Sequence, residues 1–145
     1  MKEYKNSKKP DYANSIRLQI PSHPKYLSMA RSLVFNAARE NGFSLLDCAD
    51  IRLITGEALL NIIKHAYIDS YDRPIFIDLL FFKEKLEIRL RDYGIKSKLS
   101  NLKSYDVSDY REEGIGLYLI RQLSDHYFLD QSLEQGNQLV LMKKK

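Results

Sequence analysis

Hydrophobic residues alternate with polar ones in some stretches of this chain and recur at helical spacing in others. The alternating stretches predict five strands, at residues 15–20, 74–82, 85–91, 127–129 and 138–142. The helical spacing predicts three helices, over residues 24–40, 45–66 and 116–126. Together these elements predict an α/β (α+β) fold of two layers, in which helices cover one face of a mostly antiparallel, mixed sheet.

Turn-forming and capping residues mark the ends of these elements. Residues 21–24 (Pro-Ser-His-Pro) break the first strand and lead into the first helix, which Asn41-Gly42 ends. Ser44 is expected to cap the long helix, with Asp47 in a capping-box-like position. Residues 95–113 are polar with little periodicity, which is typical of a functional lid or a disordered connection.

Length and composition indicate one ordinary globular domain. With 145 residues, 44% hydrophobic and 29% charged, the chain is long enough to bury a core. The sequence contains no run of 18 apolar residues that would predict a membrane span. Its lysine-rich start lacks the apolar segment of a secretory signal. We therefore expect a cytoplasmic domain at residues 15–145 behind a flexible basic tail at residues 1–14. Its single cysteine, Cys48, is interpreted as a small buried hydrophobe.

The net charge of +4 lies at the ends of the chain. Residues 1–13 contribute +2 and residues 143–145 contribute +3, which leaves −1 for residues 14–142. A basic binding face on the folded body is not indicated, so neither a nucleic acid nor a membrane is expected as a partner.

A polar stripe follows the long predicted helix. At ~100° per residue, Glu57, Asn61 and His65 share one arc, and Lys64 lies beside Glu57. The stripe is either an ordinary solvated face or a site. As a site, it would offer the amide oxygen of Asn61 to Mg²⁺ and the Glu57 carboxylate as a general base toward a hydroxyl group. Lys64 or His65 would then neutralise phosphate charge, unless both are surface residues.

Two glycine-containing segments follow this stripe along the chain. A carboxylate at the strand end Asp92-Tyr93-Gly94 would accept a hydrogen bond from an adenine amino group, although the same residues also suit a plain turn. The segment Gly114-Ile115-Gly116, before a predicted helix, would bring backbone N–H groups to a phosphate. Alone, a Gly-x-Gly segment is more often structural.

In this order the three elements resemble the motifs of the GHKL (Bergerat-fold) ATPases. The resemblance is strongest to the single-domain anti-sigma-factor serine/threonine kinases of bacterial partner-switching systems, and it spans about residues 15–143. The matching motifs are an N box at Glu57, Asn61 and residues 65–67, a first glycine box at Asp92 and Gly94, and a second at residues 114–117 and 119–120.

The resemblance implies specific roles. Glu57 would be the catalytic base, Asn61 the Mg²⁺ ligand and Asp92 the adenine anchor, with residues 95–113 as the ATP lid. The implied ATP-binding residues are Asn61, Lys64, His65, Asp92, Gly94, Lys96, Gly114, Ile115, Gly116 and Leu117. The implied function is ATP-dependent phosphorylation of a serine on a small anti-anti-sigma factor, in alternation with binding to a sigma factor, by a homodimer.

One departure from the family pattern leaves two functions open. The first glycine box normally reads Asp-x-Gly-x-Gly, and Lys96 stands at its last position. That lysine would either contact phosphate or impede closure of the lid. The chain is thus either an active kinase or a catalytically degenerate module that sequesters a sigma factor or antagonist without phosphotransfer. The ATP-binding half of a histidine kinase is disfavoured, because residues 1–14 are too few to form the dimerising helices.

Overall fold

A computed structural model describes residues 14–97 and 112–145 of the chain. Five strands form one sheet: β1 (Ser15–Pro21), β2 (Pro74–Phe81), β3 (Lys85–Asp92), β4 (His126–Asp130) and β5 (Asn137–Lys144). Their order is β1-β2-β3-β5-β4, and each neighbouring pair is antiparallel. The antiparallel character expected from the sequence is confirmed, and the sheet of the described residues is antiparallel throughout rather than mixed.

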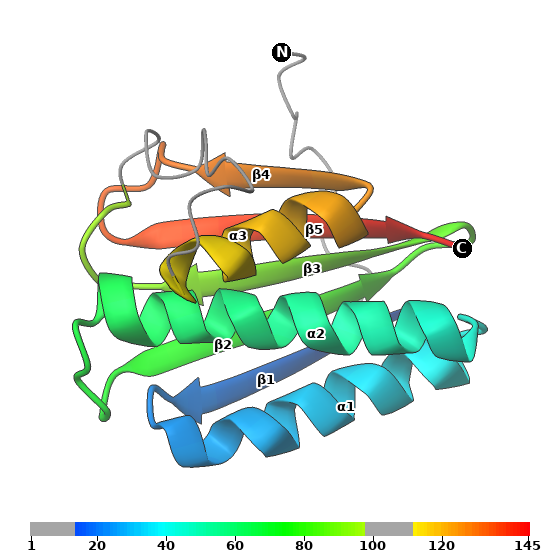
Figure 1. Ribbon diagram of the computed structural model, residues 1–145, viewed down its shortest axis with the longest axis horizontal. Coiled ribbons are helices and arrows are strands. Elements are labelled where there is room, and N and C mark those ends of the chain that lie inside the picture. The colour runs from blue at the N-terminus through cyan, green and yellow to red at the C-terminus, as the bar shows by residue number, and fades with distance from the viewer. Residues whose placement is uncertain (1–13, 98–111) are drawn as a thin grey trace.

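Three helices cover one face of this sheet (Figure 1). They are α1 (Leu27–Glu40), which follows a 3₁₀ turn η2 (Pro24–Tyr26), α2 (Leu45–Asn61), which continues as a π-helix η3 (Ile62–Ala66), and α3 (Glu112–Leu123). The two-layer fold predicted from the sequence is therefore confirmed. Within the described part of the chain, no helix has both the length and the apolarity needed to cross a membrane. Residues 1–13 of the predicted tail (1–14) and residues 98–111 of the predicted lid (95–113) lie outside the described residues.

Local chemistry explains where the first two helices begin. His23 Nδ1 accepts a hydrogen bond from the Lys25 backbone N–H (3.1 Å), which caps η2. The Ser44 hydroxyl accepts from the Asp47 backbone N–H (3.1 Å), as predicted for the cap of α2. At the far end of α1, Gly42 adopts a φ of +88°, a conformation that favours glycine.

The sequence prediction was wrong about both ends of α3. We expected a glycine turn followed by a helix over residues 116–126, but the helix begins at Glu112, so Gly114 and Gly116 lie within it. A glycine inside a helix costs about 1 kcal/mol relative to alanine, which packing against a neighbouring helix offsets. The helix ends at Leu123, and the chain then turns into β4. At this turn the Asp125 N–H donates to the Met142 carbonyl of β5 (2.9 Å).

The core lies between the helix layer and the sheet. Its largest fully buried side chains are Ile20, Ile51, Ile54, Leu59, Ile63, Ile75, Ile77, Leu79, Leu86, Ile88, Leu90 and Ile120. Each such side chain contributes about 1.5–3 kcal/mol relative to an exposed one. Ile51, Ile54, Ala58 and Leu59 of α2 belong to this core, and Cys48 is fully buried as expected. On the same helix, Leu53 is exposed.

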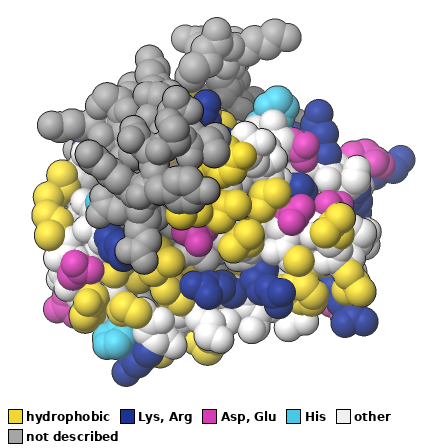
Figure 2. Space-filling view, viewed as in Figure 1, with side chains coloured by type: hydrophobic (Ala, Val, Ile, Leu, Met, Phe, Trp, Pro, Cys, Tyr) yellow, Lys and Arg dark blue, Asp and Glu magenta, His cyan; other side chains and the backbone are white. Residues whose placement is uncertain are grey.

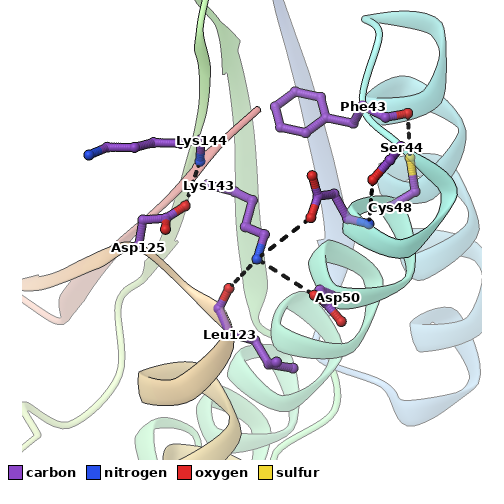
Figure 3. A network of polar contacts seen from close by, with 9 residues as sticks. Phe43, Ser44, Cys48, Asp50, Leu123, Asp125, Lys143 and Lys144 are labelled. Carbon is purple, nitrogen blue, oxygen red and sulfur yellow. Dashed lines mark hydrogen bonds and ion pairs between the residues drawn. The ribbon is translucent and has the colours of Figure 1, made fainter.

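A lysine near the C-terminus joins three elements (Figure 3). Lys143 Nζ donates to the Leu123 carbonyl at the end of α3 (2.7 Å). It also lies 3.6 Å from Asp50 Oδ2 and 4.0 Å from Asp47 Oδ1, both in the first half of α2. Strand β5 is thereby tied to both helices. We refer to Lys143, Asp47, Asp50 and Leu123 as the Lys143 clamp.

Candidate functional site

The carboxylate of Glu57 meets a glycine of the neighbouring helix. Glu57 is half-buried in α2, and a Cβ atom placed on Gly116 of α3 would lie 2.6 Å from Glu57 Oε2. Only a hydrogen at this position of α3 therefore allows the carboxylate to keep its place. Two residues selected independently from the sequence, one from the N box and one from the second glycine box, are adjacent in the structure.

The rest of the predicted polar stripe crosses a change of helix type. Asn61 is the last residue of α2 and is half-buried, whereas Lys64 and His65 lie in η3 and are exposed. In η3 the Tyr67 N–H donates to the Ile62 carbonyl five residues earlier (2.9 Å). Each residue of a π-helix turns by less than ~100°, so the spacing that aligned His65 with Glu57 does not hold beyond Asn61.

The carboxylate of Asp92 is buried at the end of β3, with 1% exposure. It accepts hydrogen bonds from the Gly94 backbone N–H (2.9 Å) and from the side-chain amide of Asn137 (3.1 Å). Burial raises the pKa of Asp92 above its ordinary value, and these hydrogen bonds, together with the charge of Arg91, oppose the rise. The site thus holds a carboxyl group whose charge is only partly compensated by the protein.

The strand end that carries Asp92 docks against the end of η3. A Cβ atom on Gly94 would lie 2.2 Å from the Ala66 carbonyl oxygen, and the Ile95 N–H donates to that same oxygen (2.8 Å). The buried Tyr67 hydroxyl adds a bridge, since it donates to the Pro74 carbonyl and accepts from the Tyr93 N–H (2.8 Å). Gly94 is therefore needed for a close backbone approach between the N box and the first glycine box.

Lys96, which replaces a family glycine, contacts the protein itself. Its side chain is on the surface, and Nζ donates to the Gln131 and Leu133 carbonyls in the connection between β4 and β5. The ammonium group is thus held by two backbone oxygens in this structure. Any role toward phosphate stays a prediction.

The remaining predicted residues lie in the first half of α3. Ile115 is 45% exposed, and Leu117 is half-buried. Leu117 lines a small hollow between α3 and the edge of the sheet, whose other lining residues are Ile120, Arg121, Tyr127 and Leu139. Glu57 and Asp92 are not part of that hollow, so the structure does not join Leu117 to them through it.

The sequence analysis missed several polar residues beside these groups. Asn137, which no sequence motif singles out, contacts Asp92 directly. The antiparallel register of β3 and β5 pairs these two residues, but the sequence does not reveal that these strands are neighbours in the sheet. On the outer face, Figure 2 shows Lys and Arg side chains near hydrophobic ones over α1 and α2. Between α1 and α2, the Arg31 guanidinium lies against Gly56, and that of Arg52 lies 4.7 Å from the Phe35 ring centre.

The oxygen donors suit a magnesium ion that a nucleotide brings with it. Among residues 14–97 and 112–145, no three His, Cys, Asp or Glu side chains form a group able to hold a metal ion. The half-buried amide of Asn61 offers one oxygen, and Mg²⁺ usually takes one or two protein ligands together with phosphate oxygens and water. The donor set therefore fits Mg²⁺ bound with a nucleotide rather than a metal site formed by protein side chains alone.

Similar proteins are known for most of the length of this chain. The model of the histidine kinase-like ATPase domain matches residues 20–143. The chain is 33% identical over 138 residues to serine-protein kinase RsbW of Listeria monocytogenes serovar 1/2a, covering 90% of this chain and 87% of that protein. It is 32% identical over 137 residues to serine-protein kinase RsbW of Bacillus cereus strain AH187, covering 89% of this chain and 83% of that protein.

Proposed function

Since the chain belongs to the histidine kinase-like ATPase domain family and, within it, to the anti-sigma-factor serine kinases, we propose that it phosphorylates a serine of a small anti-anti-sigma factor. In this proposal the kinase also binds a sigma factor in alternation with that partner. The observation that carries the proposal is the adjacency of Glu57 and Gly116, because it sets a carboxylate beside the glycine segment expected at the phosphates.

The proposed reaction assigns a task to each part of the site. The serine oxygen forms a bond to the γ-phosphorus, the bond from that phosphorus to the β,γ-bridging oxygen breaks, and ADP leaves. Glu57 accepts the serine proton, as a general base does. Mg²⁺, when bound through Asn61, would neutralise charge on the phosphate oxygens. Asp92 accepts a hydrogen bond from the adenine amino group, and Gly94 lets the strand end that carries Asp92 pack against the Ala66 carbonyl.

The other predicted residues take supporting roles in this proposal. Lys64 and His65 are exposed beyond Asn61, where a cationic side chain can reach a bound phosphate. Helix α3 begins at Glu112, so its backbone N–H groups up to that of Gly114 have no partner within the helix and suit a phosphate, because that helix end carries partial positive charge. The N–H groups of residues 115–117 lie beyond this first turn and are used within the helix. Lys96 is held by carbonyl groups and would have to leave them before it reached a nucleotide.

The proposal is tested by following radiolabelled phosphate from ATP to a candidate anti-anti-sigma protein. Glu57→Gln should bind ATP normally and lose transfer by about 10²–10⁴-fold, the usual contribution of a general base. Glu84→Gln removes an exposed carboxylate from the β2–β3 turn and is the matched control. Full transfer by Glu57→Gln would exclude Glu57 as the base.

A second candidate function is a switch module that binds its partners without phosphotransfer. It is favoured by the substitution of Lys96 for a glycine and by the contacts that hold this lysine. The same experiment separates the two functions, since only the kinase yields phosphoserine. Wild-type protein that captures its partner in the presence of ATP and forms no phosphoserine would support the switch module.

A further inference from the structure

The side chain of Asn137 links the buried carboxylate to the segment that follows it. Asn137 is 4% exposed and lies opposite Asp92 in the pairing of β3 with β5. Its amide nitrogen donates to Asp92 Oδ1 (3.1 Å) and to the Ile95 carbonyl (2.9 Å), and its amide oxygen accepts from the Ser97 N–H (2.8 Å). Because one backbone partner accepts and the other donates, only one orientation of the amide satisfies both.

These contacts leave Asn137 no donor for a ligand. Both hydrogens of its amide nitrogen are used within the protein, one toward Asp92 and one toward Ile95. Any influence of Asn137 on a bound nucleotide must therefore pass through the groups that it positions.

The two oxygens of Asp92 have unequal capacity for a further hydrogen bond. Oδ1 accepts from both the Gly94 N–H and the Asn137 amide, at 2.9 and 3.1 Å. Oδ2 has a longer contact with the same amide, at 3.4 Å, and the Asn137 backbone N–H also bonds to the carboxylate. Since each carboxylate oxygen accepts about two hydrogen bonds, Oδ2, which has the longer contact with the amide, has more acceptor capacity left than Oδ1.

A glycine holds Asn137 close to Asp92. Gly136 has a φ of +74°, and a Cβ atom there would lie 2.1 Å from the Asp92 carbonyl oxygen. Any other residue at this position would push the ends of β3 and β5 apart. The Arg91 guanidinium adds a second connection, since it donates to the Gln135 and Asn137 carbonyls.

We propose that Asn137 is the positioning residue for base recognition: its amide holds Asp92 so that Oδ2 accepts from the 6-amino group of a purine, which selects a 6-amino over a 6-oxo purine nucleotide. This inference rests on the proposed nucleotide site. A 6-oxo group has no hydrogen to donate, so its oxygen and Asp92 Oδ2, both hydrogen-bond acceptors, would face each other without a hydrogen between them. Without the Asn137 amide, Asp92 would rotate more freely and protonate more readily, and a protonated carboxyl group can donate to a 6-oxo group.

The test compares calorimetric affinities for the magnesium complexes of ATP and of inosine triphosphate, which carries a 6-oxo group. Wild-type protein should prefer ATP. Asn137→Leu should bind ATP about tenfold more weakly and inosine triphosphate about as before, so that the preference falls about tenfold. If Asn137→Leu does not fold, Asn137→Asp has a similar size and the acceptor for Ser97, and it should lose the preference in the same way.

Gln131→Ala is the matched control, because the Gln131 side chain donates to the Ser97 carbonyl (2.6 Å) but does not contact Asp92. It should leave the preference for ATP unchanged. A preference that survives both Asn137 variants, or one that Gln131→Ala lowers equally, would overturn the role of Asn137 while nucleotide binding stands. Equal affinity of the wild type for both nucleotides would also overturn it. Binding of neither nucleotide would overturn the proposed function as well.

Discussion

Asp92 carries a carboxyl group that the fold buries more completely than it neutralises. Burial is the largest influence on its pKa and raises it, while hydrogen bonds from Gly94 and Asn137 lower it. The folded state therefore binds this proton more tightly than the unfolded state does. Stability from Asp92 is present at low pH and is lost as the pH rises from the ordinary pKa of 3.8 through the raised pKa of the folded state.

This sign gives a prediction for Asp92→Asn. The variant has no proton to lose, so its free energy of unfolding should exceed that of the wild type by an amount that grows between pH 4 and pH 7, to the order of 1 kcal/mol. The same variant should lose ATP binding. Urea unfolding at several pH values measures the difference, with Asp72→Asn as the control for an exposed carboxylate. A difference that is constant with pH would contradict the expectation.

At the scale of elements, the approach of α2 to α3 depends on Gly116. Gly116→Ala should stabilise α3 by up to about 1 kcal/mol, because alanine is the better helix former. The new methyl group would displace the Glu57 carboxylate rather than the backbone, since Glu57 Oε2 is the atom that it meets first. We expect thermal stability to be kept or raised while phosphotransfer falls at least tenfold and ATP binding changes little. Equal loss of binding and transfer would indicate that the whole helix had moved.

The Lys143 clamp gives a second prediction at this scale. Lys143→Met preserves the aliphatic part of the side chain and removes the ammonium group that meets Asp47, Asp50 and the Leu123 carbonyl. The two carboxylates stay partly in contact with water, so we expect a loss of about 1–2 kcal/mol of stability, measured by urea unfolding. Lys144→Met is the control, because Lys144 contributes only its backbone N–H to Asp125.

The elements themselves were largely predictable from the sequence, and their contacts were not. Alternation and helical spacing gave the strands and the long helix because one face of each element is buried. The start of α3 was misjudged because Gly114 and Gly116 are turn residues by propensity, whereas the structure places both in a helix and packs Gly116 against Glu57 of α2. The π-helical end of α2 has no clear local signal, and Asn137 becomes meaningful only once β5 is known to lie beside β3.

For the whole molecule, nucleotide binding should appear as added stability. A ligand that binds only the folded state at 100 times its dissociation constant adds about 2.7 kcal/mol, which for a domain of this size raises Tm by roughly 5–10 °C. We expect such a rise with Mg·ATP in scanning calorimetry, and none for Asp92→Asn. Asn61→Ala should reduce the part of the rise that depends on Mg²⁺. If ATP raised the Tm of the wild-type protein equally with and without Mg²⁺, Asn61 would have no role as a metal ligand.

The distribution of charge over the molecule is compatible with binding of a triphosphate. The basic residues in excess lie at the two ends, and residues 14–142 carry a net charge of −1. The proposed site must therefore attract a triphosphate through charged groups beside it rather than through the net charge of residues 14–142. Such local attraction is consistent with the exposure of Lys64 and His65 next to Asn61.

The π-helical end of α2 makes the number of residues in that helix matter. The π-helix ends at Ala66, whose carbonyl accepts the Ile95 N–H, and it is against this carbonyl that Gly94 packs. Deletion of one residue between Ile62 and Ala66 would let the helix close in regular α-helical register, yet it would rotate the following residues away from the strand end. A chain shortened in this way would gain a more regular helix and lose the junction between its two nucleotide motifs, so this segment should accept substitutions far more readily than changes of length.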